Sequence, residues 1–259
     1  MMAPSFSAWP YARWIAHRGG GTLAPENTLA AFRLGLNYGW RMAECDVKLS
    51  ADGIPFLLHD ATLGRTTNAA LALGPGISDV AGEHPWSTLS LLDAGSWHSR
   101  LYAGEPIPTL EAVARWCRAN HSALNIEIKA TPGLERYTGE VVARHAARLW
   151  YGTPVPPLLS SFDAESLAGA RAVCPELPRA LLLKELVPDW MVQARSLGCV
   201  AVVAAHAQWT SSTVEAAHAQ GLRTLAYTVN EADAAQRLLA LDVDGVITDR
   251  IDLFSPAMI

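Results

Sequence analysis

The sequence contains few charged residues and no excess of basic ones. Only 17% of the 259 residues are Asp, Glu, Lys or Arg, and the 20 Lys and Arg are outnumbered by 25 Asp and Glu, which gives a formal net charge of −5. No run of basic residues forms a positive stripe that could follow a nucleic-acid backbone. We therefore expect no nucleic-acid partner.

The sequence also lacks a long apolar run. The longest runs, such as residues 200–205, are far shorter than the roughly 20 residues that a membrane-spanning helix needs. The stretch 1–14 contains Pro4 and Pro10 and lacks the basic start and apolar centre of an export signal. We therefore expect no membrane insertion and a cytoplasmic protein.

Cysteine is scarce, and the four cysteines are far apart. Cys45, Cys117, Cys174 and Cys199 show none of the CxxC spacing of zinc and redox sites, so we expect buried or free thiols. Half of the residues are apolar, which argues against disorder because burial can offset the entropy of ordering. The length allows one large domain, such as an α/β barrel of about 250 residues, or two small ones.

Short β-rich segments alternate with segments of helical periodicity, which is the pattern of parallel βα units. The predicted strands are 13–17, 42–48, 54–59, 124–129, 157–162, 179–183, 199–204, 222–228 and 244–248. The predicted helices are 28–37, 109–119, 135–149, 164–173, 188–197, 211–219 and 231–240. Nine strands are one too many for an eight-stranded barrel.

The extra strand is explained if segments 42–48 and 54–59 form a hairpin. They are separated by a short turn containing Asp-Gly, whereas parallel neighbours need a crossover of about a dozen residues. One turn register places His59 opposite Glu44, and a shift by one residue places it opposite Asp46. Either register puts His59 beside a carboxylate.

Residues 61–108 interrupt the alternation of strands and helices. Gly and Pro punctuate this segment, and no strand or helix period persists in it. A connection of this length in a compact domain usually covers a functional site. We expect a small insertion without a core large enough to be independent.

The first predicted strand ends in polar residues. His17 and Arg18 are followed by three glycines. In a parallel barrel, catalytic groups sit at the carboxyl ends of the strands. Glycines let backbone N–H groups approach an anion, and an arginine can form a forked contact with a phosphate. Taken alone this motif is weak, because a glycine turn after a strand is commonplace.

Two other strands carry carboxylates on one face. Glu44 and Asp46 alternate along one strand, and Asn125, Glu127 and Lys129 along another. In a barrel the intervening apolar residues face the helices, so the polar set faces the interior, where a carboxylate needs a partner or a metal. A half-exposed antiparallel sheet would show the same alternation, but the helix-rich pattern weighs against it.

Three carboxylates with few soft ligands suit a hard divalent cation, Mg²⁺, Ca²⁺ or Mn²⁺. His17 and His59 could instead be ligands, which would favour zinc. We favour the first interpretation. If Glu44, Asp46 and Glu127 hold the ion, both imidazoles are free for the proton transfers that phosphodiester hydrolysis requires.

Many short motifs occur in one order from about residue 13 to 252. They are His17-Arg18-Gly19, Pro25-Glu26-Asn27-Thr28, Glu44-x-Asp46-Val47, Asp52-Gly53, His59-Asp60, Leu63-x-Arg65-Thr66-Thr67-Asn68, Ile107-Pro108-Thr109-Leu110, Glu127-x-Lys129, Thr228-Val229-Asn230 and Asp244-Gly245-Val246-Ile247-Thr248-Asp249. In this order they resemble the glycerophosphodiester phosphodiesterase family. The ordered set is far more specific than any single motif.

The resemblance implies a (β/α)8 TIM barrel of the phospholipase-C-like phosphodiesterase type, one domain over residues 1–259 with 61–108 as its insertion. It implies metal-dependent hydrolysis of a small-molecule glycerophosphodiester to sn-glycerol 3-phosphate and an alcohol. The implied cation is Mg²⁺ or Ca²⁺, with Mn²⁺ as a third candidate, and a homodimer is left open. The implied roles are an acid/base pair, three metal ligands and two phosphate contacts: His17 and His59; Glu44, Asp46 and Glu127; Arg18 and Lys129.

Some positions bear on substrate preference. Tyr227 stands where the resembled family often has a tryptophan that lines the substrate pocket, so Tyr227 is an expected substrate-binding residue. Ile251 stands where proline is frequent. Phe162 could contact the glycerol or belong to the core. Asn27 is expected close to the site, as a helix cap or as part of it.

Two rival functions are kept. A lysophospholipase D-type phosphodiesterase would need an apolar groove or patch near the mouth of the pocket. A catalytically silent barrel that binds phosphorylated ligands would lack one or more of the core residues, and all of them are present. The attacking oxygen is either water or the substrate's own glycerol hydroxyl, which would give a cyclic phosphate first.

Overall fold

The predicted alternation of strands and helices is found in residues 9–257, which are the residues that the computed structural model describes. The strands are β1 (Trp14–Ala16), β2 (Met42–Leu49), β3 (Pro55–Leu57), β4 (Ala123–Ile128), β5 (Leu158–Ser161), β6 (Arg179–Leu183), β7 (Ala201–Ala205), β8 (Arg223–Tyr227) and β9 (Gly245–Thr248). The longer helices are α1 (Leu29–Asn37), α4 (Leu110–Ala119), α5 (Glu135–Leu149), α6 (Ala164–Val173), α7 (Trp190–Ser196), α8 (Ser211–Ala219) and α9 (Ala232–Ala240). All begin and end close to the predicted boundaries.

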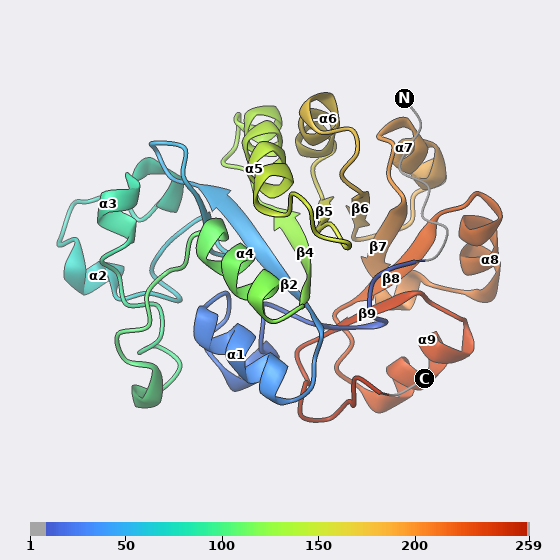
Figure 1. Cartoon of the computed structure of the whole chain (residues 1–259), viewed down its shortest axis with the longest axis horizontal. Coiled ribbons are helices and arrows are strands. Elements are labelled where there is room, and N and C mark those ends of the chain that lie inside the picture. The colour runs from blue at the N-terminus through green and yellow to red at the C-terminus, as the bar shows by residue number, and fades with distance from the viewer. Residues whose placement is uncertain (1–8, 258–259) are drawn as a thin grey trace.

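A closed parallel barrel forms the centre of the molecule (Figure 1). The strands follow the order β1-β9-β8-β7-β6-β5-β4-β2, and the parallel pairing of β1 with β2, at Ala16 and Ala43, closes the ring. β3 adds to the edge of β2 as an antiparallel strand. The predicted (β/α)8 TIM barrel with a hairpin is therefore confirmed.

Side-chain alternation along β2 shows how the strands divide the core. Cys45 and Val47 pack outward in the large apolar layer between strands and helices. Met42, near the start of β2, belongs to a separate apolar cluster inside the barrel. Glu44 and Asp46 follow on the same inward face, so the interior changes from apolar to charged toward the ends of the strands.

The hairpin is present, but neither predicted register is correct. The pairing of β2 with β3 lies midway between the two predicted registers. The reason is a three-residue loop, in which the Ser50 N–H donates to the Ile54 carbonyl and Gly53 has φ of 80°. β3 ends at Leu57, so His59 lies beyond the paired residues and is placed by the chain that follows.

Residues 61–108 form a separate group of short helices, at the left of Figure 1, which we call the insertion. It contains α2 (Ala69–Ala72), α3 (Trp86–Leu89) and two 3₁₀ turns. An apolar cluster that includes Leu63, Leu89 and Ile107 fills its interior. The Leu57 N–H donates to the Pro108 carbonyl, which ties the end of the insertion to β3. We propose that the chain is one barrel domain with this insertion in it.

The sequence also predicted buried or free cysteines and no membrane-spanning segment. The four cysteines are buried and form no disulfide in the structure of residues 9–257, as predicted. Of the helices in the same range, none is long and apolar enough to cross a membrane.

Candidate active site

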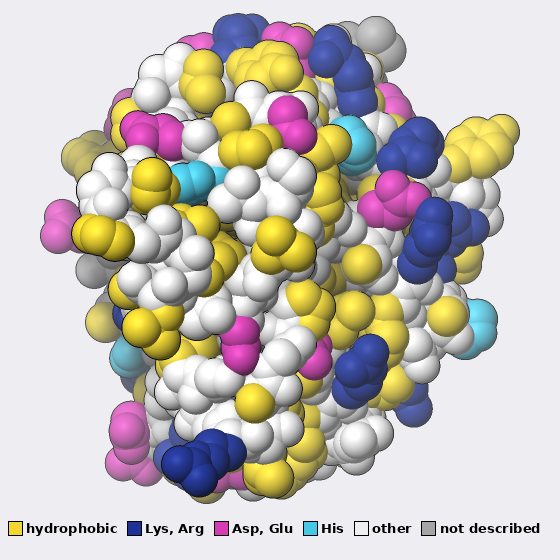
Figure 2. Space-filling view, turned by 90° about the vertical axis from the view of Figure 1, so that its left-hand side faces the viewer, with side chains coloured by type: hydrophobic (Ala, Val, Ile, Leu, Met, Phe, Trp, Pro, Cys, Tyr) yellow, Lys and Arg dark blue, Asp and Glu magenta, His cyan; other side chains and the backbone are white. Residues whose placement is uncertain are grey.

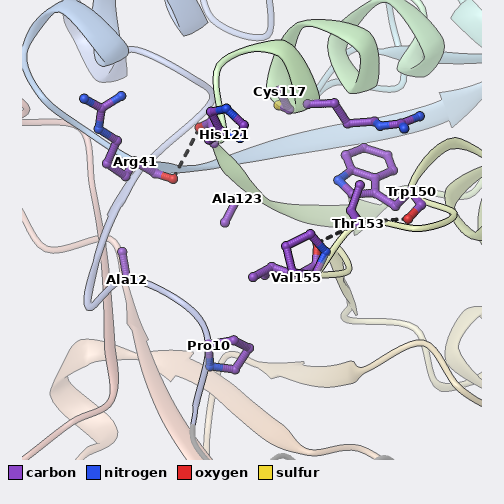
Figure 3. Close-up of a pocket in the computed structure, with 12 residues that line it drawn as sticks. Pro10, Ala12, Arg41, Cys117, His121, Ala123, Trp150, Thr153 and Val155 are labelled. Carbon is purple, nitrogen blue, oxygen red and sulfur yellow. Dashed lines mark hydrogen bonds between the residues drawn. The ribbon is translucent and has the colours of Figure 1, made fainter.

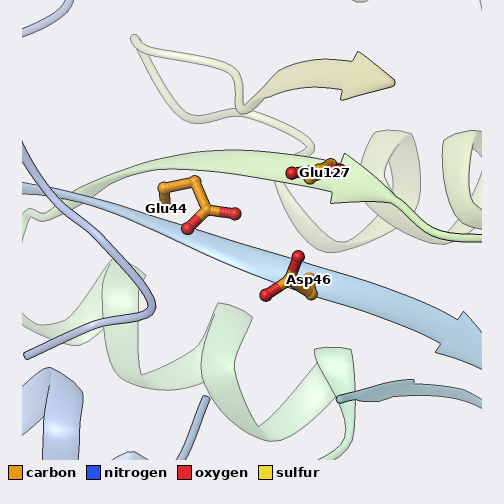
Figure 4. A group of neighbouring side chains, drawn as sticks. All are labelled: Glu44, Asp46 and Glu127. Atoms are coloured by element: carbon orange, nitrogen blue, oxygen red, sulfur yellow. The ribbon is translucent and has the colours of Figure 1, made fainter. Parts of the chain in front are cut away.

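Three carboxylates meet inside the barrel (Figure 4). Glu44 and Asp46 come from β2 and Glu127 from β4, where Asp46 and Glu127 are direct neighbours in the parallel pairing. One oxygen atom of each lies within 4.8 Å of the other two, and all three residues are buried. The structure thus brings together the three residues that the sequence singled out as metal ligands.

One oxygen atom of this cluster has no partner among the described residues, and a single ammonium lies beside two others. Glu44 Oε1 is buried and accepts no hydrogen bond. Asp46 Oδ1 and Glu127 Oε1 lie 3.5 Å and 2.6 Å from the Lys129 ammonium. Burial, together with the Asp46 charge, raises the pKa of Glu44 to about 8. Such a set of buried carboxylate oxygens fits a hard divalent cation.

Asn27 positions Asp46. The Asn27 amide Nδ2 donates to Asp46 Oδ2 at 2.8 Å, and Asn27 Oδ1 accepts from the Asp46 N–H at 3.0 Å. The cap of α1 is Thr28, whose hydroxyl accepts from the Ala31 N–H, so the interpretation of Asn27 as a helix cap is wrong. Asn27 has φ of 59°, a conformation that its contacts with Asp46 help to hold.

His17 is held by residues from the far end of the chain. Its Nδ1 lies 2.6 Å from Asp249 Oδ1, and Nε2 lies 3.7 Å from Glu44 Oε2. Asn230 donates to the other oxygen of Asp249 at 2.9 Å. Burial lowers the pKa of His17, but the Asp249 hydrogen bond and the Glu44 charge outweigh burial, and the net pKa is raised.

His59 has a carboxylate partner next to it in the sequence. Its Nδ1 lies 2.7 Å from Asp60 Oδ1, and Arg65 Nε donates to Asp60 Oδ2 at 2.5 Å. The Arg65 hydrogen bond is the main reason that the pKa of Asp60 is lowered. The pKa of His59 is lowered by burial, against the raising effects of Asp46 and Asp60.

Arg18 contacts the carboxylates of the site through both its backbone and its side chain. Its N–H donates to Glu44 Oε2 at 3.0 Å, with φ of 51°. Its guanidinium donates to Glu26 at 2.8 Å and lies 3.6 Å from Asp46 Oδ2. Glu26 also accepts from Arg65, so one network of ion pairs joins the environments of both histidines.

The two histidines line one cavity of about 840 Å³, together with Arg18, Glu127 and Lys129. Aromatic residues form another part of its wall. The Tyr227 ring meets the Phe162 ring edge-on at 5.7 Å, and the Lys129 Nζ lies 5.7 Å from the centre of the Phe162 ring. Phe162 is 39% exposed, so it belongs to the cavity wall rather than to the core. The eight predicted site residues therefore surround or adjoin one cavity.

Sequence reasoning missed three contributors to the site. Asp249 and Arg65 stand inside recognised motifs, but nothing local shows that they contact the histidines. Lys48 also lines the cavity. Its position could have been predicted, because side-chain alternation along β2 puts Lys48 on the same face as Glu44 and Asp46. Burial and the Lys129 charge lower the pKa of Lys48.

A second cavity, of about 320 Å³, lies at the opposite end of the barrel, where β2 and β4 begin (Figure 3). The guanidinium of Arg41 points away from Ala123 and Val155, and the Thr153 hydroxyl donates to the Trp150 carbonyl at 2.7 Å. Arg41, Arg118 and His121 are among the residues that line this cavity, but its lining within residues 9–257 contains no carboxylate, in contrast to the cavity at the ends of the strands.

The chain is similar to known phosphodiesterases over most of its length. The family model described as the glycerophosphoryl diester phosphodiesterase family matches residues 17–253. A glycerophosphodiester phosphodiesterase of Caldanaerobacter subterraneus is 32% identical over 237 residues, which cover 91% of this chain and 93% of that protein.

Solved structures show the same similarity. A phosphodiesterase of Oleispira antarctica, in complex with the product sn-glycerol-3-phosphate, has a TM-score of 0.81 and 33% identity, with 92% of each chain covered. A glycerophosphodiester phosphodiesterase of Agrobacterium tumefaciens has a TM-score of 0.77 and 28% identity, and the match covers 95% of this chain and 99% of that one.

Proposed function

The chain belongs to the glycerophosphoryl diester phosphodiesterase family and is a phosphoric diester hydrolase, and we propose that it hydrolyses glycerophosphodiesters with one divalent cation and two histidines. The observation that carries this proposal is the meeting of three buried carboxylates and two carboxylate-bonded imidazoles at one cavity. The products would be sn-glycerol 3-phosphate and a small alcohol.

Glu44, Asp46 and Glu127 would hold the cation, which supplies positive charge to the phosphate oxygens. The ion would be Mg²⁺ or Ca²⁺, because the ligand atoms are all carboxylate oxygens. Asn27 supports this role, since its two hydrogen bonds hold the Asp46 carboxylate in place.

His17 and His59 would transfer the protons. Each imidazole has its Nδ1 bonded to an aspartate, which leaves Nε2 as the nitrogen that exchanges a proton with the substrate. One imidazole would take a proton from the attacking oxygen, and the other would give one to the departing alcohol.

Arg18 and Lys129 would contact the phosphate, and Tyr227 and Phe162 would line the space for the substrate. Both cations lie beside the carboxylate cluster, at 3.6 Å and 3.5 Å from Asp46. The Oleispira phosphodiesterase holds sn-glycerol-3-phosphate, which supports a glycerol phosphate as the ligand of this cavity as well.

A lysophospholipid is the second candidate substrate. Its support is a set of large apolar side chains that are exposed on the insertion: Leu71, Ile77, Leu91, Trp97 and Leu101. Figure 2 shows the side of the molecule that carries the insertion, and its apolar side chains are scattered among polar surface rather than gathered into one groove. A substrate without an acyl chain is therefore favoured.

The test is hydrolysis of glycerophosphocholine by the purified protein, with the release of sn-glycerol 3-phosphate followed by a coupled dehydrogenase. Chelation should abolish the activity, and Mg²⁺, Ca²⁺ or Mn²⁺ should restore it. Lysophosphatidylcholine is assayed in parallel. Phosphorus NMR of the reaction would detect a cyclic phosphate if the glycerol hydroxyl attacks first.

Three outcomes would contradict the proposal. Full activity in chelator would exclude the cation. Faster turnover of lysophosphatidylcholine than of glycerophosphocholine would favour the second candidate. Binding of sn-glycerol 3-phosphate without turnover of any diester, with each ion in turn, would indicate a ligand-binding barrel.

A further inference from the structure

Lys48 is a buried cation in the wall of the cavity. It follows Glu44 and Asp46 on the inward face of β2, and only 6% of the residue is exposed. Its ammonium is near enough to Asp46 and Glu127 to interact with their charges. The sequence therefore places a positive group beside the carboxylate cluster, on the strand that supplies two of its members.

Lys48 differs from the two half-buried basic groups of the cavity, Arg18 and Lys129, in having no partner. Arg18 pairs with Glu26 at 2.8 Å, and Lys129 pairs with Glu127 at 2.6 Å. In the part of the chain that the structure describes, no carboxylate oxygen lies within 4.0 Å of Lys48 Nζ, and its side chain makes no hydrogen bond. Each histidine has its own aspartate.

A positive charge on a residue that is only 6% exposed is costly without a partner, so an anion that pairs with it gains interaction energy. Of the two cavity lysines that lack a partner, Lys184 lies at the exposed rim after β6, where water screens its charge. Lys48 also lines the cavity, but only 6% of the residue is exposed, so far less water surrounds its charge. An anion that enters the cavity would therefore interact more strongly with Lys48 than with Lys184.

We infer that Lys48 binds the negatively charged phosphoryl group of the substrate, as a third cation beside Arg18 and Lys129. This inference rests on the proposed function. Arg18 and Lys129 have their charges largely balanced by carboxylates, whereas the charge of Lys48 is balanced only when the phosphate is bound. Because the phosphoryl group is common to all glycerophosphodiesters, Lys48 contributes equally whatever the alcohol.

The test compares Lys48→Met with Lys184→Met, which removes the same charge from the rim. Binding of sn-glycerol 3-phosphate in the presence of Mg²⁺ is measured by calorimetry. A hydrogen bond to a charged group that is lost from a buried site weakens binding by about tenfold or more. We expect this loss for Lys48→Met, less than about threefold for Lys184→Met, and partial recovery for Lys48→Arg.

Steady-state kinetics add a second readout. For Lys48→Met, kcat/KM should fall by about tenfold or more, by the same factor for glycerophosphocholine and glycerophosphoethanolamine. A loss confined to one of the two substrates would overturn the inference and make Lys48 a contact of the alcohol. Circular dichroism checks the fold, and Lys48→Gln replaces Lys48→Met if the methionine variant does not fold.

The inference and the proposed function can fail separately. If Lys48→Met binds sn-glycerol 3-phosphate as tightly as Lys184→Met while the unaltered protein hydrolyses glycerophosphocholine, the inference is wrong and the proposed function stands. If the unaltered protein neither hydrolyses a glycerophosphodiester nor binds sn-glycerol 3-phosphate, the proposed function is wrong and the inference falls with it.

Discussion

The two histidines of the cavity have the same type of partner in different surroundings. His17 stands at the end of a barrel strand and bonds to Asp249, which is 232 residues away in the sequence. His59 stands after the hairpin and bonds to the next residue, Asp60. The side chain of His17 is 16% exposed and that of His59 is 33% exposed.

The pKa values of the two imidazoles move in opposite directions. Asp249 and the nearby Glu44 carboxylate raise the pKa of His17 despite its deeper burial. Burial and the cations Arg18 and Lys129 lower the pKa of His59 despite its own aspartate. The comparison teaches that a bonded aspartate alone does not decide which imidazole keeps its proton, because burial and the other nearby charges decide whether the aspartate's effect prevails.

The largest expected effect is on catalysis. His17→Ala and His59→Ala should each lower kcat for glycerophosphocholine by about 10²–10⁴-fold, the usual contribution of a proton-transfer group. Because His17 keeps its proton to higher pH, we expect it to be the acid. A diester with p-nitrophenol as the leaving group needs no acid, so it should restore much of the activity of His17→Ala and little of that of His59→Ala.

The order of rescue distinguishes the two roles. Recovery of His59→Ala, rather than His17→Ala, would reverse the assignment of acid and base. If both variants lost the same activity on glycerophosphocholine and on the p-nitrophenyl diester, the difference in pKa between the two histidines would not correspond to different catalytic roles. His145→Ala, which removes a histidine of α5 outside the cavity, is the control and should leave kcat unchanged.

The second expected effect is on the pKa values themselves. Asp249→Asn removes a charge that raises the pKa of His17, so that pKa should fall. Asp60→Asn should lower the pKa of His59 by a smaller amount, because that side chain is more exposed to water. Titration of the imidazole signals by NMR in metal-free protein measures both values in each variant.

Each substitution should act on its own histidine only. The comparison would be contradicted if Asp249→Asn left the pKa of His17 in place, or if it moved the pKa of His59 as far. The Arg65 network makes Asp60→Asn the harder variant to interpret, so thermal unfolding is recorded with it.

The smallest expected effect is on stability, and it concerns the carboxylates between the two histidines. In the metal-free protein the pKa of Glu44 is raised to about 8, chiefly by burial. A carboxyl whose pKa is raised on folding stabilises the protein below its unfolded pKa, and this stability is lost as the pH rises toward 8. In chelator, Tm should therefore fall by several degrees from pH 5 to pH 8, since each kcal/mol corresponds to about 2–4 °C in a domain of this size.

Two controls separate this effect from general alkaline destabilisation. Mg²⁺ should reduce the fall in Tm, because a bound cation compensates the carboxylate charges. Glu44→Gln should also reduce it in chelator. A fall of the same size in Glu44→Gln would show that Glu44 is not its source. Differential scanning calorimetry at a series of pH values gives the measurement.

The sequence predicted the barrel and the cluster of carboxylates because both depend on short-range periodicity. Glu44 and Asp46 must share a face of β2, since side chains alternate along a strand. The strands of the barrel are parallel, so their carboxyl ends gather at one end of it. These rules also place His17 and Glu127 there.

The incorrect and missed features depend on contacts that no local pattern encodes. The hairpin register depended on whether the loop has an odd or even number of residues, which the Asp-Gly signal leaves open. Asn27 precedes a helix, as a cap would, yet Thr28 is the cap and Asn27 bonds to Asp46 across the barrel. In the second case a neighbouring residue, Thr28, took the role that the local preference assigned to Asn27.

The sequence by itself determined which residues could carry the chemistry, because residue type and strand periodicity are local properties. Only the tertiary structure decided their protonation and their partners. Asp249 meets His17 because β9 pairs with β1 when the barrel closes, and Lys48 is left without a carboxylate because the carboxylates nearest to it are paired with other cations or histidines. Electrostatic energies depend on distance in space, and distance along the chain does not predict them.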